Sequence, residues 1–258
     1  MPLFYLSISF LTSLVGAICG IGGGVIIKPT LDLLQLAEPA AISFLSGCTV
    51  LSMCAYNVGR SLAAKEKNVD LAVATPLALG AAAGGVVGKQ IFSAIKNASP
   101  DPVFVGRIQA LCLMAVTLVT LVYMLRRKGI RSLHIKKKGL CILIGLLLGL
   151  ISSFLGIGGG PINLAVFYYF FSMDIKQAAQ NSLYTIFFSQ TASLITTLVT
   201  RTVPDFELQV LGLMILGGFS GGMAGRGLNK KIAAPMVDKL FMALMVAIIL
   251  ISGFNALR

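Results

Sequence analysis

The chain has 258 residues, of which 57% are hydrophobic and only 12% are charged, and its mean hydropathy is +0.91. A soluble domain carries about 25% charged residues, so this composition excludes an ordinary soluble fold and predicts a surface in contact with lipid. The net charge of +12 does not indicate nucleic-acid binding, because seven of the 21 basic residues lie in one short segment, 126–138. The positive-inside rule assigns such a segment to the cytoplasm.

The first apolar stretch, residues 3–36, contains the run Gly20-Ile21-Gly22-Gly23-Gly24 near its middle. As one helix this stretch would be about 50 Å long, well beyond the hydrocarbon layer of about 30 Å. Consecutive glycines weaken a helix, so we expect a broken, re-entrant helical hairpin with the glycine run at its tip. Three ordinary spans are predicted to follow, at 40–63, 69–92 and 104–126.

The second half repeats this order. Stretch 141–173 contains Gly156-Ile157-Gly158-Gly159-Gly160, offset by 136 residues from the first run. Pro161 follows directly, and because proline is favoured at the first helical position, a helix is expected to begin there. Further spans are predicted at 175–200, 206–228 and 235–257.

A second glycine pattern is also duplicated, at an offset of 137 residues. Gly80-x3-Gly84-Gly85-x2-Gly88 recurs as Gly217-x3-Gly221-Gly222-x2-Gly225. Small residues at this spacing let membrane helices approach closely, and we favour that packing interpretation here.

The predicted fold is an all-α polytopic membrane protein with two inverted repeats, each a glycine-broken re-entrant hairpin plus three transmembrane helices. The first repeat covers 1–128, a basic cytoplasmic loop covers 129–138, and the second repeat covers 139–258. The inversion follows from charge. Re-entrant hairpins place the basic segments 65–67 and 226–239 on the same side as the basic loop, whereas full crossings would place 226–239 outside.

Transporters with inverted repeats bind substrates at interrupted helices near the midplane. A helix that begins inside the membrane offers free N–H groups and the positive end of its dipole to an anion. The predicted substrate-binding residues belong to the two runs and to the polar faces beside them: Gly22, Gly23, Gly24, Lys28, Ser43, Ser46, Asn57, Gly158, Gly159, Gly160, Asn163, Gln180 and Asn181. The polar residues are open to a second interpretation as interhelical hydrogen-bond partners, and Lys28 as an ion pair with Asp32.

Nothing in the sequence indicates catalysis or a metal. The single histidine, His134, lies in the basic segment, and the five cysteines lie in apolar stretches without metal-ligand spacing. We therefore predict no catalytic residue, no metal ligand and no cofactor.

The duplicated glycine run, Pro29 after its first copy, and the small-polar spans from Ala40 and Ala178 resemble the TauE/SafE sulfite exporter family over nearly the whole chain. The resemblance implies transport of a small sulfur-containing anion, such as sulfite, a sulfonate or a related organosulfur anion, across the cytoplasmic membrane. It also implies that the glycine breaks form the functional centre. The second half departs from the pattern, since Ala165 stands where Pro29 would recur.

The leading hypothesis is therefore a multi-pass secondary transporter of the cytoplasmic (inner) membrane, with a small sulfur-containing anion and the lipid bilayer as partners and no nucleic acid. Two alternatives stay open at this point: a membrane-embedded enzyme acting on a lipid or thiol substrate, and a membrane assembly factor. The sequence does not indicate an oligomeric state.

Overall fold

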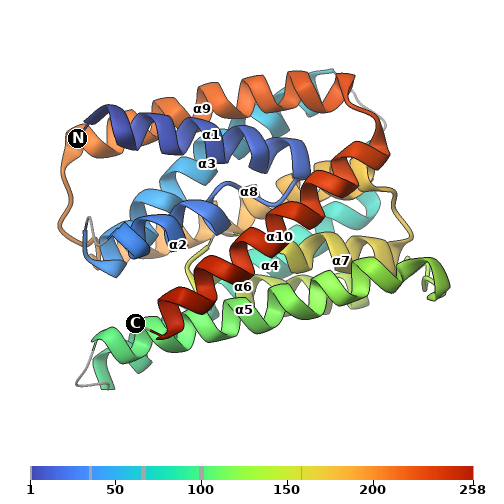
Figure 1. Cartoon of the computed structure of the whole chain (residues 1–258). Helices are drawn as coiled ribbons and strands as arrows, with labels where there is room; N and C mark the ends of the chain where they lie inside the picture. The colour runs from blue at the N-terminus through green and yellow to red at the C-terminus, as the bar shows by residue number, and fades with distance from the viewer. Residues whose placement is uncertain (1, 35–36, 65–67, 99–101, 158, 258) are drawn as a thin grey trace.

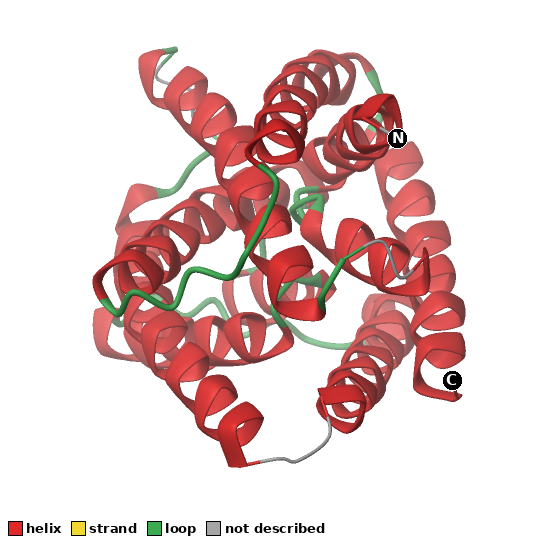
Figure 2. Ribbon diagram, turned by 90° about the vertical axis from the view of Figure 1, so that its left-hand side faces the viewer, coloured by secondary structure: helices red, strands yellow, loops and turns green. Residues whose placement is uncertain are grey.

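The fold consists of helices and their connections. A computed structural model describes residues 2–34, 37–64, 68–98, 102–157 and 159–257. In chain order the helices are α1 (Pro2–Cys19), α2 (Gly24–Leu34), α3 (Pro39–Ala63), α4 (Leu71–Ala98), α5 (Pro102–Arg126), the short 3-10 helix η1 (Arg127–Gly129), α6 (Lys138–Leu155), α7 (Pro161–Phe171), α8 (Ile175–Val199), α9 (Leu208–Lys231) and α10 (Ala234–Leu257). Figure 2 shows only helix and loop across the described residues, which confirms the predicted all-helical fold.

Seven of the described helices are long and apolar enough to cross a membrane: α3, α4, α5, α6, α8, α9 and α10. Helices α1 and α7 are also apolar but shorter. Large apolar side chains are exposed on the bundle, among them Val119 at 70% and Leu250 at 68%. Such a surface is unfavourable in water and suits lipid. The chain is therefore a multi-pass membrane protein, as predicted.

The glycine runs break the helices where the sequence predicts. Between α1 and α2, Gly20 and Gly22 have φ angles of 76° and 72°, and Gly156 ends α6 with a φ of 65°. Residues with a side chain rarely adopt this left-handed conformation. Helix α7 begins at Pro161, the predicted first helical residue. Gly158 lies outside the described residues.

Each hairpin returns to the end of the molecule from which it starts. In Figure 1, α1 begins and α2 ends at the left, where both chain termini lie, and we call this the terminal end. Helices α6 and α7 begin and end at the right, together with connection 127–137, and we call this the basic end. The other helices of each half run from one end to the other. This arrangement supports the predicted inverted repeats, which remain a prediction together with the orientation in the membrane.

The hairpins pack against helices of the opposite half: α1 lies along α9, and α6 lies along α4. Glycines permit both approaches, because an added Cβ at each would lie 2.8 Å or less from a backbone carbonyl oxygen. Gly217, Gly221 and Gly225 face the carbonyls of Leu6, Phe10 and Leu14, and Gly80, Gly84 and Gly88 face those of Ile142, Leu146 and Leu150. The packing interpretation of these glycines is confirmed. The two sets of carbonyls differ by 136 positions, the offset of the glycine runs.

Candidate functional site

The two glycine breaks meet inside the bundle. A Cβ added to Gly24 would lie 2.4 Å from the carbonyl oxygen of Ile157, so the start of α2 touches the second break directly. Gly22 and Gly159 both lie against the side chain of Ile186 on α8, with added Cβ atoms 3.6 Å and 2.5 Å from its Cδ1. Segments more than 130 positions apart in the sequence thus form one buried centre.

The first turn of α2 is enclosed by protein. Besides the Ile157 carbonyl, an added Cβ at Gly24 would lie 2.9 Å from the Ser46 hydroxyl and 3.0 Å from Val50. The Ser46 hydroxyl is buried and makes no hydrogen bond to the described residues. Gly23 packs in the same way against the backbone of Ser13 on α1. An anion at this helix end would have to displace these groups.

A cavity of about 220 Å³, whose lining includes many polar side chains, reaches the second break from the terminal end. It contains Lys89 of α4, whose ammonium donates a hydrogen bond to the hydroxyl of Thr197 on α8. Of the described residues that line it, none is Asp or Glu, and many carry hydroxyl or amide groups: Ser43, Ser93, Ser152, Ser153, Gln190 and Ser193. We call it the Lys89 cavity. Because one water occupies about 30 Å³ in the liquid, a small oxyanion fits there with several waters.

Four of the predicted site residues lie at or beyond the inner end of this cavity. Ser43 lines it, and its hydroxyl would lie 2.9 Å from a Cβ added to Gly156. Gly159 and Asn163 lie deeper, beside a void of about 10 Å³, which is close to the smallest space that holds one water. The Asn163 Oδ1 is buried without a hydrogen-bond partner among the described residues. Gly160 is extended and precedes the first turn of α7.

Lys28 does not line the Lys89 cavity. Its buried ammonium donates to Oε1 of Gln109 at 2.6 Å and to the carbonyl of Leu155 at 3.2 Å, while Nε2 of Gln109 donates to the carbonyl of Phe154 at 2.6 Å. These carbonyls belong to the last turn of α6, where a cation opposes the negative end of the helix dipole. Lys28 also lines a separate cavity of about 300 Å³ with Asp32.

The remaining predicted residues lie toward the basic end. The Asn57 carbonyl and Gln180 Oε1 accept hydrogen bonds from the guanidinium of Arg226, at 3.0 Å and 3.4 Å. Oδ1 of Asn181 accepts from the backbone N–H of Asp70 at 3.0 Å, so this side chain ties the start of α4 to α8. The Asn181 amide donates to the carbonyls of Asn68 and Gln177.

Sequence reasoning missed Lys89 and Arg226 as site residues, although α4 and α9 carry these cations into polar surroundings. A signal for them was present. Each follows the last glycine of the duplicated pattern, Lys89 after Gly88 and Arg226 after Gly225. The predicted spans 69–92 and 206–228 contain both residues, but the predicted site residues were taken from other helices.

Metal chemistry finds no support in the described part of the chain, where no three His, Cys, Asp or Glu side chains lie close enough to hold an ion. The five cysteines are free thiols. Cys48 is the one that lines the Lys89 cavity, within the residues described there.

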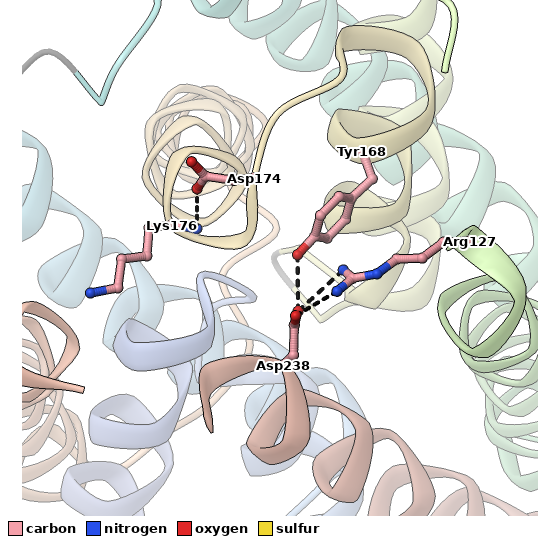
Figure 3. A network of polar contacts seen from close by, with 5 residues as sticks. All are labelled: Arg127, Tyr168, Asp174, Lys176 and Asp238. Carbon is pink, nitrogen blue, oxygen red and sulfur yellow. Dashed lines mark hydrogen bonds and ion pairs between the residues drawn. The ribbon is translucent and has the colours of Figure 1, made fainter. Parts of the chain in front are cut away.

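A second polar cluster lies at the basic end (Figure 3). Asp238 of α10 accepts hydrogen bonds from the Arg127 guanidinium at 3.2 Å and 2.5 Å and from the Tyr168 hydroxyl at 3.0 Å. The same guanidinium lies 4.5 Å from the centre of the Tyr168 ring, a cation–π distance. The basic connection is held nearby, because the N–H groups of Leu133 and Ile135 donate to carbonyls at the end of α7.

Fold and cavity together define the class of protein: a multi-pass membrane protein in which two broken hairpins meet beside a chamber lined by hydroxyl and amide groups. The chain belongs to the sulfite exporter TauE/SafE family, which it matches over residues 5–251, and this confirms the resemblance seen in the sequence. It is also similar to the "Probable membrane transporter protein YunE" of Bacillus subtilis (strain 168), at 24% identity over 259 residues, covering 91% of this chain and 90% of that protein. No solved structure matches it significantly.

Proposed function

We propose that this protein is a secondary transporter that moves a small sulfur-containing anion, such as sulfite or a sulfonate, across the cytoplasmic membrane. The Lys89 cavity is the observation that carries the proposal. It joins one ammonium group to neutral hydroxyl and amide groups, and it ends at the second glycine break.

The chemistry of this lining suits an oxyanion that must bind and then leave. Taking an anion out of water is unfavourable unless hydrogen-bond donors replace the water. Lys89 supplies a charge-assisted donor, and the serine hydroxyls supply neutral ones that can turn toward different oxygen atoms. A second cation beside the first would hold the anion more tightly and slow its release.

Lys28 has an indirect part in this proposal. The Lys89 cavity reaches Gly156, just after the last turn of α6, where the negative end of the helix dipole would repel an anion. Lys28 and Gln109 donate to two carbonyls of this turn from the other side. We therefore regard Lys28 as a group that screens the α6 end, and the glycine breaks as the wall of the chamber.

Flux measurements in liposomes test the proposal. The purified chain should move sulfite or a sulfonate in preference to chloride. Lys89→Gln should weaken anion binding by about tenfold or more, the loss expected for one charged hydrogen bond. Lys89→Arg should retain most of the binding. Lys176→Gln is the matched control, because it removes a lysine near the start of α8 that lines neither cavity.

Two results would count against the proposal. If the wild-type chain moves no sulfur anion on the panel, the substrate class is wrong. If Lys89→Gln binds and transports as the wild type does, the Lys89 cavity is not the anion site.

A further inference from the structure

Arg226 occupies in the second half the position that Lys89 occupies in the first. The two residues differ by 137 positions, the offset of the glycine pattern that each one ends. Their helices bring them to comparable places, since Gly88 lies against the Leu150 carbonyl and Gly225 against the Leu14 carbonyl. Those two carbonyl residues differ by 136 positions. Helix α4 ends at the terminal end and α9 at the basic end (Figure 1), so the two cations lie on opposite sides of the breaks.

The contacts of the two cations correspond as well. Lys89 donates to the Thr197 hydroxyl, and Arg226 donates to the Ser61 hydroxyl at 2.8 Å. Thr197 and Ser61 differ by 136 positions. The correspondence is not a property of the sequence alone, because each hydrogen bond joins one half of the chain to the other.

The neighbours of Arg226 extend the correspondence. Its guanidinium also donates to the Asn57 carbonyl and to Gln180 Oε1. At the same offset of 136 these residues match Ser193 and Phe44, and both of those line the Lys89 cavity. The positions of Asn57, Ser61 and Gln180 thus have counterparts that line the Lys89 cavity or bond its ammonium.

The two sites differ in access. Lys89 is only partly buried and opens into the cavity, whose described lining includes Thr202 and Pro204 of the connection at the terminal end. Arg226 is only 5% exposed and lines neither of the two large cavities. Its hydrogen bonds join α9 to α3 and α8. At the corresponding place in the first site there is an open cavity instead.

We infer that Arg226 is a second anion-binding station, which corresponds to the Lys89 cavity and is closed in this structure. During transport the two stations alternate, so that one is open while the other is closed. This inference rests on the proposed function. When the basic end opens, the Arg226 guanidinium exchanges the Ser61 and Gln180 oxygens for those of the oxyanion, which its planar pair of N–H groups fits. The same step closes the Lys89 cavity by drawing α3, α4 and α8 together. An anion entering beside Lys89 leaves beside Arg226.

Two variants of Arg226 separate binding from transport. Arg226→Gln should retain equilibrium binding of sulfite at the Lys89 cavity within about twofold. Its net flux should fall by about tenfold to a hundredfold, because the second station has lost its charged donor. Arg226→Lys keeps the charge and should recover part of the flux. Lys89→Gln, in contrast, loses binding and flux together.

Thiol reactivity is a second measurement, and it would not respond to changes at Arg226 if that residue had only a structural role. Native Cys48 lines the Lys89 cavity and should react with a membrane-impermeant reagent from one face only, with sulfite protecting it. In a Cys48→Ser background, the thiol of Ser61→Cys should be unreactive at rest. It should become reactive from the opposite face during sulfite flux. Arg226→Gln should reduce that second reactivity, and Arg226→Lys should restore it.

The outcomes distinguish the two proposals. Absence of any anion flux in the wild type would remove the proposed function. Wild-type flux that Arg226→Gln leaves unchanged would overturn this inference alone. The inference would equally fail if both Arg226 variants lose flux to the same extent, or if Ser61→Cys never becomes reactive during transport. Should Arg226→Gln not fold, Arg226→Lys and the Ser61→Cys labelling decide the question.

Discussion

Replacing Lys28 with methionine tests whether the buried ammonium behind the second break neutralises the end of α6. In the structure this ammonium donates to Gln109 Oε1 at 2.6 Å and to the Leu155 carbonyl at 3.2 Å. Methionine is similarly flexible and unbranched but donates nothing. Lys28→Met therefore leaves two acceptors in the protein interior without this donor.

The expected effect has two parts. Each buried acceptor that loses its donor costs about 1–3 kcal/mol, and a cation at a helix C-terminus contributes about 0.3–2 kcal/mol. Removing a buried charge returns some desolvation energy, so we expect the free energy of unfolding to fall by about 2 kcal/mol. Sulfite binding in the Lys89 cavity should also weaken by about fivefold, which corresponds to about 1 kcal/mol, because the exposed helix end then repels the anion.

A double-mutant cycle with Gln109→Met makes the test specific. Thermal unfolding and sulfite binding would be measured for the wild type, both single variants and the double variant. Because Lys28 and Gln109 share a charged hydrogen bond, the double variant should be more stable than the sum of the single effects predicts, by about 1.5–3 kcal/mol. Additive effects would refute the coupling. Wild-type stability and affinity in Lys28→Met would refute the screening role altogether.

Two further predictions concern packing and the basic end. Gly84→Ala places a Cβ 2.0 Å from the Leu146 carbonyl, so α4 and α6 must separate and thermal stability should fall by about 1–3 kcal/mol. Gly59→Ala meets nothing within 4 Å and should be neutral or stabilising by up to about 1 kcal/mol; equal effects of the two would contradict the close packing. Asp238→Asn weakens the contact with Arg127 and should cost about 1–3 kcal/mol, while proteolysis of connection 130–137 should become faster. A cleavage rate equal to that of the wild type would show that this cluster does not hold the connection.

The helices and their breaks could be predicted because the signals are local. Hydropathy sets the length of each span, three adjacent glycines interrupt one, and Pro161 fixes the start of α7. The packing of Gly84 and its neighbours was also within reach, since the spacing of small residues indicates a helix contact. It did not indicate which helix is the partner. That choice depends on the crossing of the two halves, and no residue of α4 identifies α6.

The site was harder to predict because its polar groups find partners far along the chain. Lys28 was placed near the anion by its distance from the glycine run, but its ammonium bonds Gln109 and Leu155 in other helices. Asn181 was predicted as a ligand on a polar face, and the hydrogen bond by which it holds the start of α4 could not be read from the sequence. Lys89 was passed over because a lysine near the end of a predicted span, here 69–92, usually extends to the membrane interface. Only the fold shows that it points into a cavity.

The crossed packing of the hairpins has a consequence for how the chain is made. Helix α1 packs along α9, so the packing partner of its carbonyl-lined face is absent until residues 208 onward have been synthesised. At about 5–20 residues per second this interval lasts roughly 10–40 s. Helix α6, by contrast, finds α4 already present in the membrane. We expect the ribosome-bound nascent chain to assemble its second hairpin first, leaving the first exposed to insertases and quality-control proteases until synthesis is nearly finished.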